Sequence, residues 1–226
     1  KEAYRAGKTI DKLYMLKGEF DVTLNSIRSL AKEARTVISY GDRAMLDKLA
    51  GGGNHQGEVA AVTDFSYCTV QDIIDGARAK NEPLLILLLD GITDPHNLGA
   101  IIRSAECFGA HGIVIPKHRS VSVNDTVVKV ASGATEYMPI AKVTNINDVI
   151  RDLKEQNVWV YATDFDGKAP NAVNLSGDIA IVIGSEGEGI HRLTKQLCDD
   201  TLTIPQYGEV NSLNASVAAG IVLYEA

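Results

Sequence analysis

Three loops place small hydrogen-bonding side chains, glycines and single charged residues directly beside apolar runs. One contains Asn97, Gly99 and Arg103, another reads GSEGEG over residues 184–189, and the third reads NSLN over residues 211–214. Backbone N–H groups and side-chain amides that meet at the start of a helix can orient a polar ligand. These loops are therefore the candidate positions for ligand binding and for chemistry.

The glycine loop 184–189 differs from the loops that bind dinucleotides or phosphates. Its order is G-x-x-G-x-G rather than G-x-G-x-x-G, and no Lys-Ser or Lys-Thr pair follows it. The carboxylates of Glu186 and Glu188 would also repel a pyrophosphate. The loop favours a cofactor without phosphate groups, above all one with a positive charge.

Arg103 and Asn214 each have a structural interpretation beside the functional one. Arg103 lies in an otherwise apolar helix and could pair with Glu106, which is one turn further along. The last helix is expected to start at Ser212, with an apolar stripe at helical spacing formed by Leu213, Val217, Ile221 and Tyr224. Either Asn211 or Ser212 is sufficient as its N-cap, so Asn214 would be surplus to capping. An ion pair and a doubly capped helix start remain alternatives at this point.

Strands and helices alternate from residue 83 onwards and would position the three loops. Apolar runs such as LLILLLD, residues 84–90, and DIAIVIG, residues 178–184, are typical of buried strands in a parallel sheet with helices on both faces. Such sheets bind ligands beyond the carboxyl ends of their strands. The alternation alone predicts a Rossmann-like α/β domain.

Three parts of the chain differ in pattern. Residues 1–63 form a compact α/β unit, residues 64–82 are a more polar joint with one short helix, and residues 83–226 hold the regular alternation. Within the first part, GGGNHQG at residues 51–57 is dense in glycine, so its backbone can approach a partner closely. A mobile loop tip is an equally good interpretation.

Charge is distributed unevenly along the chain, whose net charge is −7. Residues 1–60 carry ten Lys and Arg against eight Asp and Glu, whereas residues 61–226 carry twelve against twenty-one. If RNA binds, the first part must attract its phosphates, because the field of the rest repels them. The candidate phosphate contacts, each also explained as a solvated side chain, are Lys8, Lys12, Lys17, Arg28, Lys32 and Arg35.

No membrane span, disulfide or metal site is expected. The longest apolar run, LLILLL, is too short to cross a bilayer. The three cysteines lie far apart and the five histidines show no metal-ligand spacing, which suits a reducing cytoplasm. The chain begins without Met inside a helix-like pattern, so we expect that its true N-terminus is missing.

Together the three loops resemble the three motifs of the SpoU (TrmH-type) branch of the SPOUT RNA methyltransferases. The pattern N-x-G-x-x-x-R is matched by Asn97, Gly99 and Arg103, and G-x-E-x-x-G by Gly184, Glu186 and Gly189. The pattern I-P-x-x-G-x-x-x-S-L-N-x-S is matched by Ile204, Pro205, Gly208, Ser212, Leu213, Asn214 and Ser216. The N-terminal unit, with His55, Gln56 and Gly57, is similar to the ribosomal-protein-like RNA-binding domain of bacterial enzymes that methylate a guanosine ribose of 23S rRNA.

The resemblance implies an α/β fold with a C-terminal SPOUT trefoil-knot domain, which has a mostly parallel sheet and follows the small α/β RNA-binding domain. It implies S-adenosylmethionine as cofactor and methylation of a ribose 2′-hydroxyl of a guanosine in 23S rRNA or a precursor ribosomal particle, by a cytoplasmic homodimer. The residues implied to enclose the adenosine are Thr163, Gly184, Ile204 and Leu213. Those implied in catalysis are Asn97, Arg103, Glu186, Ser212 and Asn214, and His55 joins the RNA contacts.

Within this resemblance, Arg103 would clamp phosphate and stabilise a developing alkoxide, since a guanidinium with a pKa above about 12 is a poor base. Asn97 and Asn214 would orient ribose or the arginine, Ser212 would cap the helix, and Glu186 would fix the glycine loop or hold the arginine. Alternatives are a tRNA ribose methyltransferase, a noncatalytic ribosome-assembly factor and a nucleotide-dependent oxidoreductase.

Overall fold

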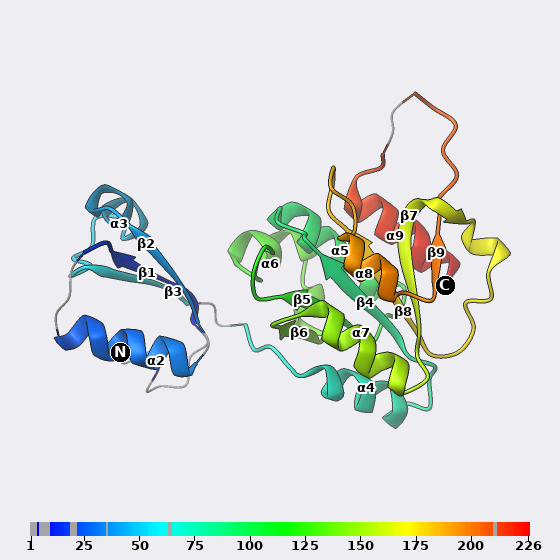
Figure 1. Cartoon of the computed structure of the whole chain (residues 1–226), viewed down its shortest axis with the longest axis horizontal. Coiled ribbons are helices and arrows are strands. Elements are labelled where there is room, and N and C mark those ends of the chain that lie inside the picture. Colours follow the sequence, from blue (N-terminus) through cyan, green and yellow to red (C-terminus); the bar gives the residue numbers. More distant parts are fainter. Residues whose placement is uncertain (1–3, 5–9, 19–21, 35, 63–64, 210–211) are drawn as a thin grey trace. The chain divides into compact units, whose positions relative to one another are not determined.

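The computed structural model divides the chain into two compact units, Lys1–Ser66 and Tyr67–Ala226. It describes residues 4, 10–18, 22–34, 36–62, 65–209 and 212–226 (Figure 1). Two of the expected RNA contacts, Lys8 and Arg35, lie outside the described residues, as does Asn211.

The first unit is a three-stranded sheet in the order β2-β1-β3, in which β1 is parallel to β2 and antiparallel to β3. Its elements are β1 (Ile10–Leu16), α2 (Val22–Glu33), β2 (Val37–Gly41), α3 (Arg43–Leu49) and β3 (Glu58–Val62). The apolar side chains of α2 recur every three or four residues, so they form one face that packs on the sheet. Leu13 and Met15 of β1 meet Leu24, Ile27 and Ala31 of α2 in the core.

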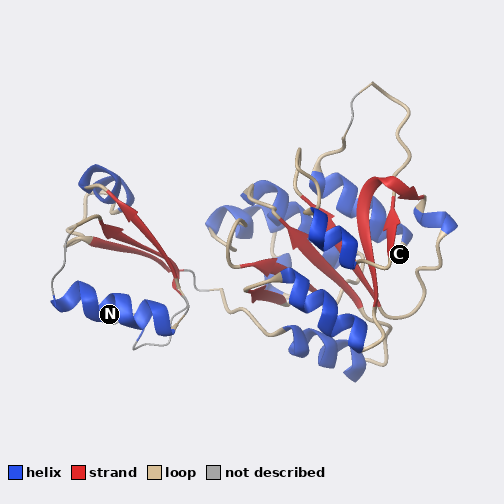
Figure 2. Cartoon of the chain, in the orientation of Figure 1, coloured by secondary structure: helices blue, strands red, loops and turns tan. Residues whose placement is uncertain are grey.

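The second unit is built on a six-stranded, entirely parallel sheet in the order β6-β5-β4-β8-β7-β9 (Figure 2). Its strands are β4 (Leu85–Asp90), β5 (Gly112–Pro116), β6 (Ile140–Val143), β7 (Trp159–Lys168), β8 (Ile179–Gly184) and β9 (Asp200–Leu202). The central strands β4 and β8 are almost completely buried, as continuous apolar runs in a doubly covered sheet should be. The predicted α/β class and parallel sheet are confirmed.

Helices connect these strands and cover the sheet. They are α4 (Val70–Ala79), α5 (Pro95–Cys107), α6 (Asp125–Ala131), α7 (Ile146–Glu155), α8 (Arg192–Leu197) and α9 (Ala215–Glu225), with short 3-10 turns at Ala134–Glu136 and Pro170–Ala172. Gly99 allows α5 to approach α6 closely, because a Cβ atom there would lie 2.7 Å from the Cβ of Val130. A larger residue than glycine at this position would push the two helices apart.

The short helix expected within residues 64–82 is α4, and it packs into the core of the second unit. Its Ile73, Ile74 and Ala77 are buried in the same cluster as β4 and α7. Burying each isoleucine side chain contributes about 1.5–3 kcal/mol, which ties this helix firmly to the sheet. The helix is therefore part of the core of the second unit.

Helix α9 begins later than expected and presents a different face. The expected start was Ser212, with Leu213, Val217, Ile221 and Tyr224 as its apolar stripe. In the structure α9 starts at Ala215 and buries its small and aliphatic positions Ala215, Ala219, Val222 and Leu223. Val217, Ile221 and Tyr224 are exposed by 49%, 37% and 73%, so the expected stripe lies on the outer side of the helix.

Candidate active site

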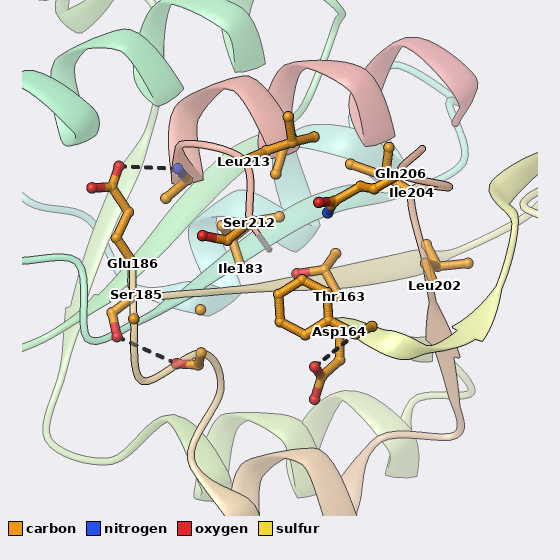
Figure 3. A pocket seen from close by; sticks show the side chains of 16 residues that line it. Thr163, Asp164, Ile183, Ser185, Glu186, Leu202, Ile204, Gln206, Ser212 and Leu213 are labelled. Atoms are coloured by element: carbon orange, nitrogen blue, oxygen red, sulfur yellow. Dashed lines mark hydrogen bonds between the residues drawn. The ribbon is translucent and has the colours of Figure 1, made fainter. Parts of the chain in front are cut away.

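A cavity of about 240 Å³ opens where β8 and β9 end, beside the middle of β7, and residues from all three strands line it (Figure 3). The four residues expected to enclose an adenosine, Thr163, Gly184, Ile204 and Leu213, all line this cavity. Ser212 and Glu186 line it as well. The structure therefore brings the glycine loop and the C-terminal loop to one site. The spacing of the motifs along the chain alone does not predict this.

Glu186 ties the three motif loops together. Its Oε1 accepts a hydrogen bond from Asn97 Nδ2 at 2.9 Å, one from the amide of Asn214, and one from the backbone N–H of Ala215 at 3.2 Å. Asn214 Nδ2 also donates to Asn97 Oδ1 at 2.8 Å. Bonds to a carboxylate are stronger than those between neutral groups, so one side chain fixes the relative positions of three distant segments.

Asn214 is the N-cap of α9, which corrects the expectation that Asn211 or Ser212 caps the helix. Its Oδ1 accepts from the backbone N–H groups of Ser216 at 3.0 Å and Val217 at 3.3 Å. The two ends of the same amide thus serve two purposes, because Oδ1 caps the helix while Nδ2 joins Glu186 and Asn97. Ser212 is left to line the cavity.

Gly184 is required by the close approach of the glycine loop to itself. A Cβ atom at this position would lie 2.3 Å from the carbonyl carbon of Gly189 and 2.5 Å from the backbone nitrogen of Ile190. Ser185 and Gly189 exchange two backbone hydrogen bonds of 3.0 Å, which close the loop. The wall of the cavity here is therefore backbone, with no room for a side chain.

Sequence reasoning missed the rim formed by residues 164–166, where β7 continues past Thr163. Asp164 and Phe165 line the cavity, and Lys195 of α8 contacts the carboxylates of Asp164 and Asp166 at 2.7 and 2.5 Å. Hydrogen bonding to Asp164 and Asp166 raises the pKa of Lys195, and the bond from Lys195 lowers the pKa of Asp166. The ion pairs thus stay charged near neutral pH and hold the rim in place. The distance of Lys195 along the chain hid this arrangement from the sequence.

Arg103 lies outside the cavity, on the exposed side of α5. Among the described residues its guanidinium has no hydrogen bond or ion pair, so neither the expected pair with Glu106 nor a contact with Glu186 is formed. Glu186 holds the two asparagines instead. Ala100 and Ser104 of α5 face α9, and so does Phe108, the residue that follows α5. The rings of Phe108 and Tyr224 pack edge to face with centroids 6.0 Å apart.

The expected RNA contacts of the first unit lie in different surroundings. Lys17 and Lys32 are exposed, whereas Lys12 lies over the ring of Tyr14 and Arg28 over that of Tyr40. The side chain of His55 is only 5% exposed: Nε2 contacts Asp47 at 3.0 Å and Nδ1 accepts from the N–H of Gly57 at 3.0 Å. Its ring therefore shapes the glycine-dense loop rather than facing a ligand.

The lining of the cavity fits S-adenosylmethionine in its charge and polarity. Side chains of Ile183, Leu202 and Ile204 offer apolar walls for an adenine ring. Among the described residues that line it there is no lysine or arginine, while Asp164 and Glu186 supply negative charge. Such a site favours a sulfonium cation and disfavours a pyrophosphate.

Other chemistries have little support in the described ranges. No group of three or more possible metal ligands occurs there, and no helix there is long and apolar enough to span a membrane. The three cysteines are free, and burial raises the pKa of Cys198 to about 12, so this thiol stays protonated at neutral pH.

Comparison with known proteins assigns the chain to a family. Residues 84–224 match the SpoU rRNA Methylase family, and residues 1–68 match the RNA 2′-O ribose methyltransferase substrate binding family. The chain belongs to the SpoU family of RNA 2′-O-methyltransferases, and the resemblance read from the three motifs is confirmed.

Several relatives extend over nearly the whole chain. It is 40% identical to the 23S rRNA (guanosine-2′-O-)-methyltransferase RlmB of Escherichia coli K12, over 98% of this chain and 91% of that protein. It is 44% identical to the RlmB of Vibrio parahaemolyticus, over 94% of this chain and 86% of that protein. The SpoU methyltransferase AviRb of Streptomyces viridochromogenes, solved in complex with AdoMet, is 26% identical with a TM-score of 0.64 and covers 99% of this chain and 84% of its own.

Proposed function

We propose that this protein transfers a methyl group from S-adenosylmethionine to the ribose 2′-hydroxyl of a guanosine in 23S rRNA. The observation that carries the proposal is the cavity whose walls come from the second and third motifs and whose loops are tied to the first by Glu186. The substrate follows from the two RlmB relatives at 40% and 44% identity. A cytoplasmic site of action, on rRNA or on a precursor particle, belongs to the same proposal.

Thr163, Gly184, Ile204 and Leu213 would hold the adenosine through backbone groups and apolar contacts. When bound, S-adenosylmethionine supplies an electrophilic methyl group on a sulfonium sulfur. The protein's part is to align the ribose hydroxyl with that group in a site that excludes water, since alignment lowers the barrier of a reaction between two bound partners. Ser212, at the cavity wall, is placed to contact the hydroxyl or the loop.

Arg103 would hold the phosphate beside the target ribose and stabilise the oxygen as its proton leaves. Its guanidinium is exposed and unpaired among the described residues, so it is available to RNA. Asn97 and Asn214, held by Glu186, fix the start of α5 and the start of α9. They therefore position the first and third motifs. Asn97 is only 7% exposed, which suits such a structural role.

A homodimer through the outer faces of α5 and α9 completes the proposal. Phe108, Val217, Ile221 and Tyr224 expose a large part of their apolar surface there, and water contact with such a patch is unfavourable. Arg103 is exposed on α5, so this dimer would place it at or beside the interface between the two copies. Ile221→Glu should convert the dimer to a monomer in light scattering coupled to size exclusion; an unchanged dimer would exclude this face.

The reaction can be tested with labelled S-adenosylmethionine and unmodified 23S rRNA, with tRNA as the second substrate. A 2′-O-methyl group blocks alkaline cleavage of its own linkage, so an alkali-resistant labelled dinucleotide that contains guanosine is expected from 23S rRNA. Label found only in tRNA would replace the proposed substrate. Label in alkali-sensitive mononucleotides would contradict ribose methylation.

A further inference from the structure

A second cavity, of about 340 Å³, opens at the same edge of the sheet, where β4, β5 and β6 end. Asp90, Pro116 and Thr144, at or directly after those strand ends, line it. Gly91 also lines it, and a Cβ at Gly91 would lie 3.5 Å from the Cβ of Ser185, which lines the cofactor cavity. The two cavities are therefore neighbours, separated by the start of the glycine loop.

Unlike the first cavity, the second has an arginine in its lining. His118, Arg119 and His191 line it, and its acidic residue, Asp90, is already engaged. Asp90 accepts from the backbone N–H of His191 at 2.9 Å and contacts His191 Nδ1 at 2.8 Å. Asp90 forms no hydrogen bond or ion pair with Arg119 among the described residues, so the guanidinium keeps its N–H donors for a ligand.

The loop that carries Arg119 is anchored on both sides. Lys117 N donates to the carbonyl of Val143 at 2.7 Å, and Val121 N and the Ser120 hydroxyl donate to the carbonyl of Ile92 at 2.9 and 3.1 Å. Arg119 itself has a φ of +57°, a left-handed conformation that is uncommon for a residue with a side chain. The backbone of this loop is thus held in place, and the exposed Arg119 side chain forms no hydrogen bond or ion pair with the described residues.

We propose that this cavity binds a backbone phosphate of the substrate RNA next to the nucleotide being methylated, with Arg119 as the principal contact and His118 as a further donor. The inference rests on the proposed function, since it takes RNA as the substrate. A guanidinium matches the geometry of a phosphate with two parallel N–H donors. With a phosphate held here, the neighbouring ribose would be directed toward the cofactor cavity across the glycine loop.

The test uses the full chain, unmodified 23S rRNA and the variant Arg119→Gly, because glycine removes the cation and accepts the left-handed backbone without strain. The Kd for RNA and the KM for RNA should rise about fivefold to fiftyfold, with kcat at saturating RNA nearly unchanged. The slope of log Kd against log salt should fall by about 0.7–0.9, the value for one phosphate contact. The Kd for S-adenosylmethionine, measured by calorimetry, should stay the same.

Two comparisons make the result decisive. Arg119→Lys keeps the charge and should recover part of the affinity and the salt slope. Arg151→Ala removes an arginine of α7 that lies outside the cavity and pairs with Asp148, and it should change neither quantity. An unchanged RNA affinity and salt slope in Arg119→Gly would overturn the proposal, as would an equal loss of cofactor binding, which would indicate a structural loop.

Failure of the proposed function would give a different pattern. If the unaltered protein binds RNA but transfers a methyl group to neither 23S rRNA nor tRNA, the proposed methyl transfer is contradicted. Loss of one phosphate contact in Arg119→Gly would then still support the cavity as an RNA site.

Discussion

The two halves of one sheet edge hold cavities of contrasting chemistry. At the ends of β8 and β9, beside the middle of β7, the walls are apolar side chains and backbone, with carboxylates and no lysine or arginine among the described lining residues. At the ends of β4, β5 and β6 an arginine and two histidines line the space, and the carboxylate there is engaged by His191. The geometry of a parallel sheet places ligands at this edge, but the side chains decide which ligand each half accepts.

The contrast suggests that the two cavities of one domain bind different ligands. The first cavity suits a cation with an adenine ring, and the second suits an anion. Arg103 lies in neither of them. Substitutions should therefore separate cofactor binding, RNA binding and methyl transfer, and each of the following changes is aimed at one of these.

The largest effect is expected from Arg103→Ala, which should abolish transfer, by at least about a thousandfold, while the Kd for S-adenosylmethionine stays the same. Transfer should be lost because the alkoxide and the phosphate would have no cation to stabilise them. The Kd should not change because Arg103 contacts neither the cavity nor the Glu186 cluster. Single-turnover kinetics and calorimetry would measure the two quantities. Arg78→Ala, an exposed arginine of α4, is the matched control. Near-normal methylation by Arg103→Ala would remove this residue from the mechanism.

Asn214→Ala should lower turnover about tenfold to a thousandfold, because it removes a hydrogen bond to Glu186 as well as the cap of α9. The matched control is Asn124→Ala, which removes the side-chain cap of α6 outside the site. Loss of the cap should lower the free energy of unfolding by about 1 kcal/mol in both variants, measured with urea. Asn214→Ala should lose more than Asn124→Ala, because it also breaks the bonds to Glu186 and Asn97. Equal turnover in the two would reduce Asn214 to a helix cap.

Gly184→Ala should weaken S-adenosylmethionine binding about tenfold to a hundredfold, because the added methyl group overlaps the backbone of Gly189 and displaces the loop. Binding of RNA through the second cavity should persist, which fluorescence anisotropy would show. Gly76→Ala is the control, since a Cβ atom there meets nothing within 4 Å. If Gly184→Ala bound the cofactor normally, the adenosine would have to lie elsewhere.

The smallest effect is expected from Lys195→Met, which removes the cation shared by Asp164 and Asp166. The Kd for S-adenosylmethionine should rise about twofold to fivefold, because the pairs are partly exposed and worth little each. The pKa of Asp166, which Lys195 holds below its ordinary value, should rise in an NMR titration. Lys154→Met, which breaks a pair with Asp199 away from the cavity, should leave both quantities unchanged.

Periodicity and composition predicted the alternation of strands and helices along the chain. Continuous apolar runs of strand length are typical of a parallel sheet that is covered on both faces. Convergence of the three loops came only through the family motifs, since spacing along a chain does not determine which strand ends are neighbours. The trefoil knot stays a prediction of the same kind. The individual roles of the site residues also remain proposals.

Where the sequence misled, competing local choices were nearly equivalent. Asn211, Ser212 and Asn214 are all good caps, and the choice of Asn214 coincides with its bond to Glu186, 28 residues earlier in the chain. The helical spacing of Arg103 and Glu106 allowed a pair that the structure does not form. The loop with Arg119 matches none of the three motifs. Its proposed role therefore rests on its position in a cavity beside the glycine loop.

The double use of the Asn214 amide also makes the activity sensitive to chemical loss of its nitrogen. Hydrolysis of this amide to aspartate would leave an isosteric side chain that still caps α9 but has lost its N–H donors. Its new negative charge would then lie in contact with Glu186 and push the segments apart instead of joining them. A stored sample could thus keep its fold and lose its activity through the exchange of one nitrogen for oxygen.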